Sequence, residues 1–359
     1  MENVNYLGLV YGLYFIGSIV FSVLINFIFL RFAQNLGMRG EIDKSDRWSP
    51  IQKPAFGGIS FYILFLLSFS TFSIFFSSDN QFPNNVMLGL VFATAISFLM
   101  GLADDAFNTK PLLKLAVQIL SAVILISTGT YIEIFSSTEL NYLITILWVV
   151  GLMNSINMLD NMDAITSLVS IIIIFSTLLL MFISGNYHNV YFFTLIGVMA
   201  SLLGFLYFNW HPSRLFMGDT GSQFLGLFLA FIGIRFFWNA EYLVLQNPIL
   251  DKFILIMAIF AMPLIDTSIV TINRILRKQS PMVGGKDHTT HTMVYMGLSD
   301  RQVAILFSVL SMLFSFTTIY IMSVEKALSS MFEVGMVCLF LILFFSFLYL
   351  NRLLLKSQK

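Results

Sequence analysis

Long apolar runs recur along the whole sequence and restrict its possible folds more than any other feature. An α-helix needs about 17 to 25 such residues to cross a hydrocarbon core of roughly 30 Å. Of the 359 residues, 58% are hydrophobic and 11% are charged, against about 25% charged in an average soluble domain. We therefore predict an all-α, polytopic integral membrane protein. Its eleven expected spans are 8–32, 56–78, 86–103, 113–130, 138–155, 165–184, 190–209, 221–240, 251–276, 302–323 and 331–353.

Positive charges divide unevenly between the two ends of these expected helices. When Lys and Arg are sorted by alternate helix ends, sixteen fall on one side and three on the other, Arg235, Lys252 and Lys326. The richer side faces the cytoplasm by the positive-inside rule, so we expect the N-terminus outside and the C-terminus inside. The first run is longer than a signal-peptide core and lacks a cleavage pattern, so it is expected to remain as a span.

The polar segments on the cytoplasmic side are denser than those on the outer side. Each contains at least one Asp, and together they supply Asn, Ser, Thr, Gly, Lys and His. Brought to one face of a helix bundle, they would build one polar site, so residues 1–359 are expected to form a single domain. The five segments are 40–58, 103–118, 154–164, 209–222 and 277–291.

Two adjacent acids, Asp104 and Asp105, end a long apolar run. A carboxylate at the centre of a membrane helix costs about 2.5 to 3.5 kcal/mol, less near the ends, and adjacent like charges repel. A divalent cation, or the ammonium group of Lys110 or Lys114, would offset both costs. The pair therefore indicates a functional site, with a capping or solvated role as the alternative.

The segment NSINMLDNMD places Asn154, Asn157, Asp160 and Asp163 at intervals of three residues. On a helix or a 3₁₀ turn, this spacing lines amides and carboxylates along one face. Asn offers a donor and an acceptor, so the pattern suits a ligand with many hydroxyls or a heterocycle. A polar helix surface is the alternative, although apolar runs on both sides leave little room for one.

The segment FMGDTGS places Gly218, Asp219, Gly221 and Ser222 directly before an apolar run. Glycines allow close backbone approach, the free N–H groups of a helix start favour an anion, and an Asp beside them can hold Mg²⁺. An ordinary helix cap is the alternative. Phe216 either packs against its neighbours or stacks on a base.

The segment GGKDHTTH contains Lys286, Asp287, His288 and His291. Two His at this spacing suggest a transition metal, but no third nitrogen or sulfur ligand stands nearby in the sequence. Phosphate contact by His288 and His291 beside Lys286 is favoured over a zinc site, and a plain surface loop is the other alternative.

Together, these groups suit phosphoryl transfer, in which the protein mainly positions groups and neutralises charge. Their place at the inner membrane face indicates one lipid phosphate substrate and one soluble nucleotide derivative. The main rival is an ion-coupled secondary transporter using intramembrane acids such as Asp266. That class requires acids spread through the bilayer, whereas most acids here lie in segments on one side.

In this order, the segments resemble the polyprenyl-phosphate N-acetylhexosamine-1-phosphate transferases, the superfamily that includes the bacterial phospho-MurNAc-pentapeptide translocase. The resemblance implies transfer of an N-acetylhexosamine 1-phosphate from a UDP-sugar to a polyprenyl phosphate, releasing UMP at the cytoplasmic face of the bacterial inner membrane. It implies Mg²⁺, with Mn²⁺ as the alternative, a homodimer as one expected assembly, and no nucleic acid. The matching pieces are Pro54 with Gly57 and Gly58, the Asp104–Asp105 pair with Lys114 and Gln118, NSINMLD, NWHPSRLFMGDTGS, PLIDT at 263–267 and GGKDHTTH.

The resemblance also implies roles for individual residues. Asp219 is the expected metal ligand with Asp105 beside it, and Asp104 or Asp105 is a candidate base near the lipid phosphate. The other expected substrate contacts are Asn154, Asn157, Asp160 and Asp163 on the nucleotide, Phe216 on uracil, and Lys53, Lys114, Lys286, His288 and His291 on phosphates or the rest of the donor.

The chain departs from the family pattern in two places. Asn161 and Ala164 stand where the family commonly has Gly in DGxDG, so the local backbone is expected to differ. The histidine motif, often HxHH, is DHTTH here, which is closer to the branch that builds O-antigen and related polysaccharides than to the peptidoglycan branch. This difference argues against the MurNAc-pentapeptide as the donor.

Overall fold

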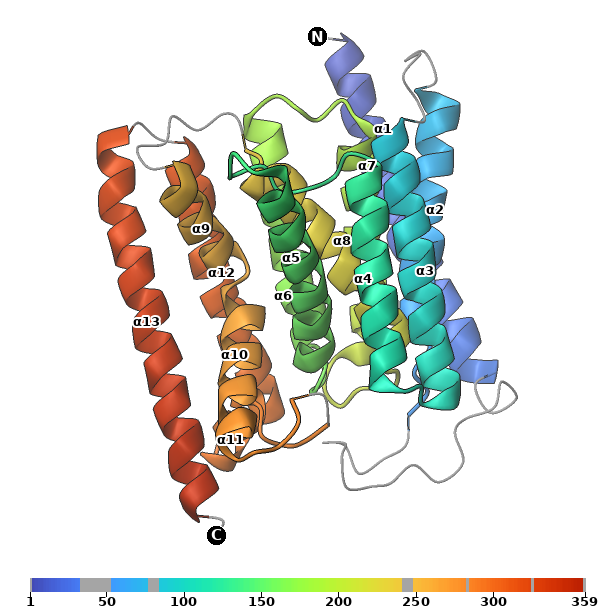
Figure 1. Cartoon of the computed structure of the whole chain (residues 1–359). Coiled ribbons are helices and arrows are strands. Elements are labelled where there is room, and N and C mark those ends of the chain that lie inside the picture. Colours follow the sequence, from blue (N-terminus) through green and yellow to red (C-terminus); the bar gives the residue numbers. More distant parts are fainter. Residues whose placement is uncertain are drawn as a thin grey trace.

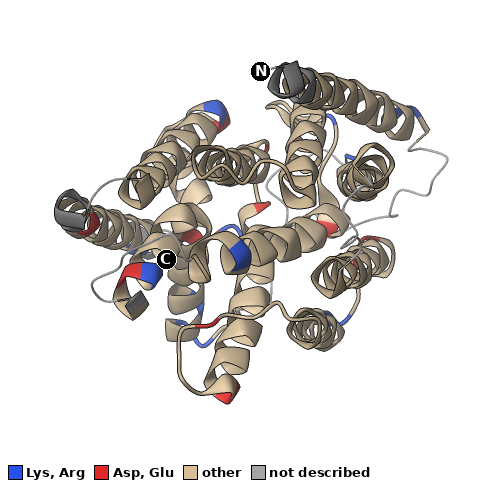
Figure 2. Ribbon diagram, turned by 90° about the horizontal axis from the view of Figure 1, so that it is seen from above, with Lys and Arg blue, Asp and Glu red and all other residues tan. Residues whose placement is uncertain are grey.

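The computed structural model describes residues 2–32, 53–76, 84–240, 248–281, 284–323 and 326–357. Within these ranges all regular structure is helical, without a β-strand. The helices run side by side in one bundle, and the chain begins and ends at opposite ends of it (Figure 1). Seen end-on, most of the ribbon carries no charge (Figure 2). Parts of three predicted segments lie outside the described residues, namely 40–52, 77–78 and 282–283.

The helices correspond closely to the predicted apolar runs, and several begin with a side-chain N-cap. Asn84, Ser137 and Asn189 each accept a hydrogen bond from a backbone N–H in the first turn that follows. The elements are α1 (Glu2–Phe32), α2 (Gly57–Phe75), α3 (Asn85–Phe107), α4 (Pro111–Ser127), α5 (Thr138–Leu159), α6 (Ile165–Ile183), α7 (Val190–Asn209), α8 (Gly218–Ile232) with a π-helical end η1 (Gly233–Trp238), α9 (Pro248–Ile259), α10 (Ala261–Leu276), α11 (Thr289–Tyr295), α12 (Asp300–Ser323) and α13 (Lys326–Ser357).

The lengths and composition of these helices are those of a multi-pass membrane protein. Among the described residues, nine helices are long and apolar enough to span a bilayer, and the bent pair α9 and α10 makes a tenth if it counts as one span. The shorter apolar helix α4 occupies another predicted run. The predicted number of eleven spans and the predicted orientation of the termini stay predictions.

The run 251–276 was expected to form one helix, and that expectation is wrong. α9 and α10 meet at 87°, with Phe260 between them. Pro263 lies in the first turn of α10. A proline has no N–H and its ring clashes with the carbonyl four residues earlier, which here belongs to Ile259, so a continuous helix cannot pass this point.

Helix α8 forms the centre of the bundle and carries the predicted GDTGS segment at its start. Within an 18-residue stretch of the span that α8 forms with η1, 89% of the residues are buried. α3 approaches it closely at Gly101, where an added Cβ would lie 2.3 Å from the Asp219 carbonyl oxygen. The absence of a side chain at this point therefore brings the Asp104–Asp105 end of α3 against the start of α8.

Candidate active site

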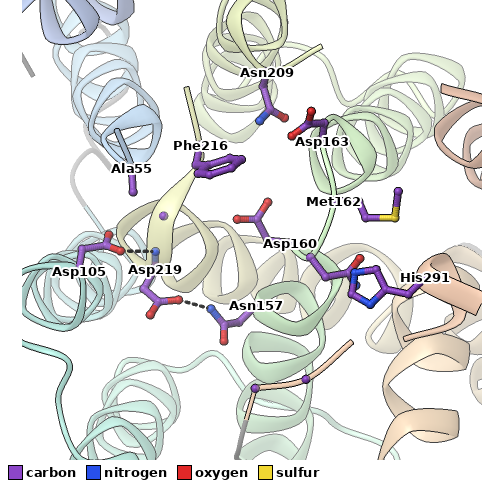
Figure 3. A pocket seen from close by; sticks show the side chains of 14 residues that line it. Ala55, Asp105, Asn157, Asp160, Met162, Asp163, Asn209, Phe216, Asp219 and His291 are labelled. Carbon is purple, nitrogen blue, oxygen red and sulfur yellow. Dashed lines mark hydrogen bonds between the residues drawn. The ribbon is translucent and has the colours of Figure 1, made fainter. Parts of the chain in front are cut away.

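A cavity of about 300 Å³ lies where α3 and α5 end and α8 begins, beside the histidine loop. Phe216 and Asp160 project toward its centre in Figure 3. Residues from four of the predicted segments meet here, as well as Ala55 from the described part of the fifth. The lining residues are Ala55, Asp105, Asn157, Asp160, Asn161, Met162, Asp163, Asn209, Phe216, Gly218, Asp219, Gly284, Gly285 and His291.

Asp219 and Lys114 form the charged centre of the site. The side chain of Asp219 is 29% exposed, although most residues of the helix that carries it are buried. Lys114 Nζ lies 3.3 Å from Asp219 Oδ2 and 3.1 Å from Asp104 Oδ2, so one ammonium group bridges two carboxylates. Asn157 Nδ2 donates to Asp219 Oδ1 and, over 2.8 Å, to Ser222 Oγ.

The two adjacent acids have separate partners. Asp105 accepts hydrogen bonds from the Asp219 and Thr220 backbone N–H groups and the Thr220 hydroxyl, at 3.0, 2.8 and 2.6 Å, and so caps the start of α8. Asp104 accepts from the N–H and hydroxyl of Thr109 and from Lys114. Of the two acids, Asp104 is therefore the one that Lys114 compensates, and Asp105 is the one that lines the cavity.

Gly218 permits the sharp entry of the chain into α8. Its φ of +75° lies in the left-handed region, and an added Cβ would lie 2.5 Å from Ala55 O and 2.7 Å from Asp105 Oδ2. Backbone hydrogen bonds from Phe216 N to Pro54 O and from Gly57 N to Phe216 O join the two segments. This pairing holds the Phe216 ring at the cavity, with Lys53 Nζ 4.9 Å from the ring centre.

Asp163 connects the end of the amide ladder to the segment before α8. It accepts hydrogen bonds from Ser213 N and Oγ at 3.0 and 2.7 Å, and His211 Nδ1 lies 3.0 Å away. Lys53 donates to Ser213 Oγ and lies 3.8 Å from Asp163. His211 and Ser213 were missed as individual residues, although both stand in the quoted segment NWHPSR.

Asn209 was also missed, and it shapes the same corner. Its side-chain oxygen accepts from Ala164 N at 3.0 Å, and its amide donates to Leu215 O. Ala164 has a φ of +68°, the region that favours glycine. The conformation that a glycine would adopt freely is therefore present at Ala164 despite the departure from the family motif.

The predicted amide ladder lies on one helix only in part. Asn154 and Asn157 belong to α5, Asp160 caps its end, and Asp163 lies beyond it. Asn157, Asp160 and Asp163 line the cavity. Asn154 is not among the lining residues, and its amide donates to Gln118 Oε1 at 2.9 Å.

The histidine loop brings one of its two predicted His to the cavity. His291 lines it, while His288 Nδ1 lies 2.9 Å from Asp266 Oδ2, and Asp266 also accepts from Thr289 N at 2.7 Å. Lys286 is exposed and is not among the lining residues. Thr290 Oγ1 donates to Asn161 Oδ1, which ties this loop to the end of α5.

Two groups of this loop have displaced pKa values. Burial raises the pKa of the Asp287 carboxyl, but hydrogen bonds and charges from Arg274 and Arg277 outweigh it and lower the pKa to about 2. Burial, together with the nearby His288, lowers the pKa of His291 from 6.5 to about 4. At neutral pH, the His291 imidazole that lines the cavity is therefore uncharged.

The residues around Asp219 are compatible with Mg²⁺. Among the described residues no three His, Cys, Asp or Glu side chains come together as a ligand group. Mg²⁺ commonly takes only one or two protein carboxylates, with waters and substrate phosphates completing its shell. Asp219, exposed at the cavity edge and oriented by Asn157, suits that role, whereas the Asp105 oxygens already accept from the start of α8.

Comparison with known proteins identifies the family of the chain. The model of glycosyl transferase family 4 matches residues 87–237. A probable undecaprenyl-phosphate N-acetylglucosaminyl 1-phosphate transferase of Bacillus subtilis is 31% identical over 252 residues, which cover 68% of each chain. The chain therefore belongs to glycosyl transferase family 4.

Two further relatives are similar over comparable lengths. The decaprenyl-phosphate N-acetylglucosaminephosphotransferase of Mycobacterium leprae is 29% identical, covering 70% of this chain and 69% of its own. A phospho-N-acetylmuramoyl-pentapeptide-transferase of Streptococcus pneumoniae is 29% identical, covering 57% of this chain and 66% of its own. The family 4 match contains Asp104, Asp105, Lys114, Asn157 and Asp219, and ends before the histidine loop.

Proposed function

We propose that this protein transfers an N-acetylhexosamine 1-phosphate from a UDP-sugar to a polyprenyl phosphate such as undecaprenyl phosphate. The observation that carries the proposal is the partly exposed Asp219 side chain at the cavity edge, held by Lys114 and Asn157. The relatives are named as transferases of this chemistry on undecaprenyl or decaprenyl phosphate. The products would be a lipid-diphosphate-sugar and UMP.

The proposed reaction is a direct displacement. An oxygen of the polyprenyl phosphate bonds to the β-phosphorus of the UDP-sugar, and the bond from that phosphorus to the bridging oxygen breaks. The bridging oxygen leaves with UMP. A phosphate monoester is largely ionised at neutral pH, because its second pKa is near 6, so no base needs to remove a proton.

Each group at the cavity has a task that follows from its position. Lys114 does not itself line the cavity, but its Nζ lies 3.3 Å from Asp219, so it would supply positive charge beside the carboxylate that faces the transferred phosphates. Phe216 offers a flat ring for stacking on uracil, and Asp160 and Asn157 offer hydrogen-bonding groups to the nucleotide. The uncharged His291 can donate one hydrogen bond to a phosphate or to the sugar.

Mg²⁺, or Mn²⁺ in its place, would be held by Asp219 at the end of the site nearest Asp105. When bound, it would neutralise negative charge on the phosphates. Asp105 would position this site, because it accepts hydrogen bonds from the backbone N–H groups of Asp219 and Thr220.

The proposal includes a location. Most Lys and Arg belong to the helix ends on the side of the cavity, so the positive-inside rule favours a site facing the cytoplasm of a bacterial inner membrane. The donor sugar and the polysaccharide that it initiates, with O-antigen as our expectation, are parts of the same proposal.

The transporter alternative loses its main support. It depended on Asp266 as an ion-coupling acid, but this side chain is completely buried and hydrogen-bonded to His288 and Thr289. An acid on an ion path must be reachable from water during transport.

The direct test is release of UMP by the purified, full-length protein. Undecaprenyl phosphate would be mixed with a panel of UDP-N-acetylhexosamines, with Mg²⁺ or with EDTA. We expect UMP with at least one donor and none in EDTA. If no donor yields UMP while the protein remains folded, the proposed function is wrong.

A second measurement separates direct displacement from a covalent enzyme intermediate. Labelled UMP would be incubated with the UDP-sugar and enzyme, without the lipid. Direct displacement predicts no label in the UDP-sugar until polyprenyl phosphate is added. Exchange without lipid would indicate a covalent intermediate instead.

A further inference from the structure

A layer of side-chain amides lies one helical turn deeper in the bundle than the charged centre of the site. Its members are Gln118 on α4, Asn154 on α5 and Gln223 on α8. Asn154 Nδ2 donates to Gln118 Oε1 at 2.9 Å, and Gln118 Nε2 donates to Gln223 Oε1 at 3.0 Å. Gln118 and Gln223 are 1% and 0% exposed, so the layer does not reach the cavity.

Each amide of the layer is paired along its own helix with Lys114 or Asp219 of the charged centre, or with Asn157, which is bonded to Asp219. Gln118 follows Lys114 by four residues, Gln223 follows Asp219 by four, and Asn154 precedes Asn157 by three. Residues three or four apart share a helix face, one turn above the other. The same three helices therefore meet twice, first through Lys114, Asp219 and Asn157, and again through the amides.

The requirement for register is strict at the charged centre. Lys114 must reach two carboxylates on α3 and α8, and Asn157 must reach Asp219 and Ser222 across from α5. A slide of one helix along its axis would break these contacts together. Hydrogen bonds between amides are directional, so they resist such a slide where apolar packing alone would tolerate it.

Stability alone does not explain the layer. Gln223 Nε2 is buried and has no hydrogen-bond partner among the described residues. A buried N–H without a partner destabilises a fold, and an apolar side chain of the same shape would avoid that cost. The amides are thus better explained by the geometry that they impose.

We propose that the layer formed by Gln118, Asn154 and Gln223 is a positioning device for the transfer reaction. It sets the axial register of α4, α5 and α8, so that Lys114, Asn157 and Asp219 meet at the cavity. The proposal rests on the proposed function, and it assigns Asn154 to positioning and not to the substrate. The three amides are positioning residues, since they act through the side chains one turn away.

The kinetic test uses a triple variant of the full chain, Gln118→Met, Asn154→Leu and Gln223→Met, which replaces every amide of the layer with an apolar group of similar volume. We expect the melting temperature to stay at or above that of the wild type, because no unpaired amide remains. We also expect kcat to fall at least 10-fold, with KM for the UDP-sugar changing less than 3-fold.

Two further variants separate positioning from a general effect on folding. The double variant Gln118→Asn with Asn154→Gln swaps the two side chains, so both amides remain and their summed side-chain length is unchanged. We expect it to keep most of the wild-type kcat. Asn141→Leu is the matched control, because Asn141 is a buried amide at the other end of α5, bonded to the backbone of Phe135. It should lower the melting temperature while leaving kcat per folded protein unchanged.

A distance measurement tests the proposal without any turnover. Spin labels on α4 at Ile119→Cys and on α5 at Leu147→Cys, both exposed on the outside of the bundle, would be introduced with Cys338→Ser to remove the single native thiol. The triple variant should shift or broaden the distance distribution between the labels, whereas Asn141→Leu should not.

The outcomes are distinct. A triple variant with wild-type kcat and an unchanged distance distribution overturns the positioning role. A rise in KM at unchanged kcat overturns it in favour of substrate contact by Asn154. If the wild type itself releases no UMP, the proposed function fails, and the distance measurement still decides whether the layer fixes helix register.

Discussion

Asp219 and Asp266 are both acids within apolar helices, but their surroundings differ in a way that separates chemistry from support. The Asp219 side chain is 29% exposed, lines the cavity and meets a lysine and an asparagine. Asp266 is completely buried, and its oxygens are bonded to His288 Nδ1 and Thr289 N. Asp219 can receive a ligand from the cavity, whereas Asp266 anchors the loop that carries His291.

The difference shows that burial of an acid in a membrane protein does not identify its role. What matters is whether the carboxylate keeps access to a cavity after its protein partners are counted. By this measure we assign Asp219 to the proposed reaction and Asp266 to the scaffold. The two centres should then respond to substitution in opposite ways, the first in activity and the second mainly in stability.

Apart from substitution of Asp219 itself, the largest effect is expected at the Asp219 centre from Lys114→Met. This change removes the only ammonium that bridges Asp104 and Asp219 within the described structure, so charge on the phosphates is less well neutralised. We expect kcat to fall by about 10²- to 10³-fold, as for loss of one preorganised electrostatic group. UMP release measures the effect.

Lys114→Arg is the matched control for charge. Its planar guanidinium keeps the positive charge but not the compact geometry of the ammonium, so we expect partial activity. A Lys114→Met enzyme within threefold of the wild-type kcat would show that the bridge has no part in catalysis.

The next effect is expected at the Asp266 centre from Asp266→Leu. Removal of the carboxylate leaves His288 Nδ1 and Thr289 N buried without their partner, which costs about 1 to 3 kcal/mol for each unsatisfied group. The melting temperature in detergent should therefore fall clearly. Asp266→Asn can keep both hydrogen bonds and should fall much less, and equal melting temperatures for Asp266→Leu and wild type would remove the anchor role.

A smaller, pH-dependent effect is expected at His291, which lies between the two centres. Its pKa is about 4 in the fold against 6.5 unfolded, so the unfolded chain binds a proton first as pH falls. Stability should be complete above pH 6.5 and decline by up to about 3 kcal/mol as pH falls toward 4. Chemical denaturation at several pH values should show this slope in the wild type.

His291→Gln supplies the comparison for that slope. Glutamine does not titrate, so the part of the pH dependence that belongs to His291 should disappear. Parallel slopes in both proteins would mean that His291 is not held neutral by its surroundings.

The smallest effect is expected from Ala164→Gly, at the turn between α5 and α6. Ala164 has a φ of +68°, and a non-glycine residue in the left-handed region costs about 1 kcal/mol or more. After the greater entropy of glycine in the unfolded chain is subtracted, we expect a gain of about 0.5 kcal/mol. Ala122→Gly inside α4 should instead lose about 1 kcal/mol, and a loss at both sites would contradict the strain at Ala164.

The sequence was sufficient for the helices and for most of the cavity. The length of each apolar run predicts a span, and the short polar segments between spans must lie at one end of the bundle or the other. The pattern alone therefore identified several residues that line the cavity, among them Asn157, Asp160, Phe216 and Asp219. The break at Phe260 was missed because hydropathy carries no backbone direction, although Pro263 was visible as its cause.

Individual roles were harder to predict because they depend on packing between helices. Asp104 and Asp105 are adjacent, but successive residues on a helix point about 100° apart, so they reach different partners. Asn154 and Asn157 belong to the same three-residue repeat on α5. Which of them reaches the cavity depends on how far α5 extends beside α8. His211 and Ser213 act through Asp163, which no local pattern reveals.

The most direct test of the account compares Asp219→Asn with Asp266→Asn in the same assay of Mg²⁺-dependent UMP release. Both changes remove one charge and keep the shape of the side chain. We predict that Asp219→Asn lowers kcat at least about 10³-fold with little change in melting temperature, while Asp266→Asn retains at least a tenth of the wild-type kcat. Wild-type turnover by Asp219→Asn would contradict the assignment of this cavity as the active site.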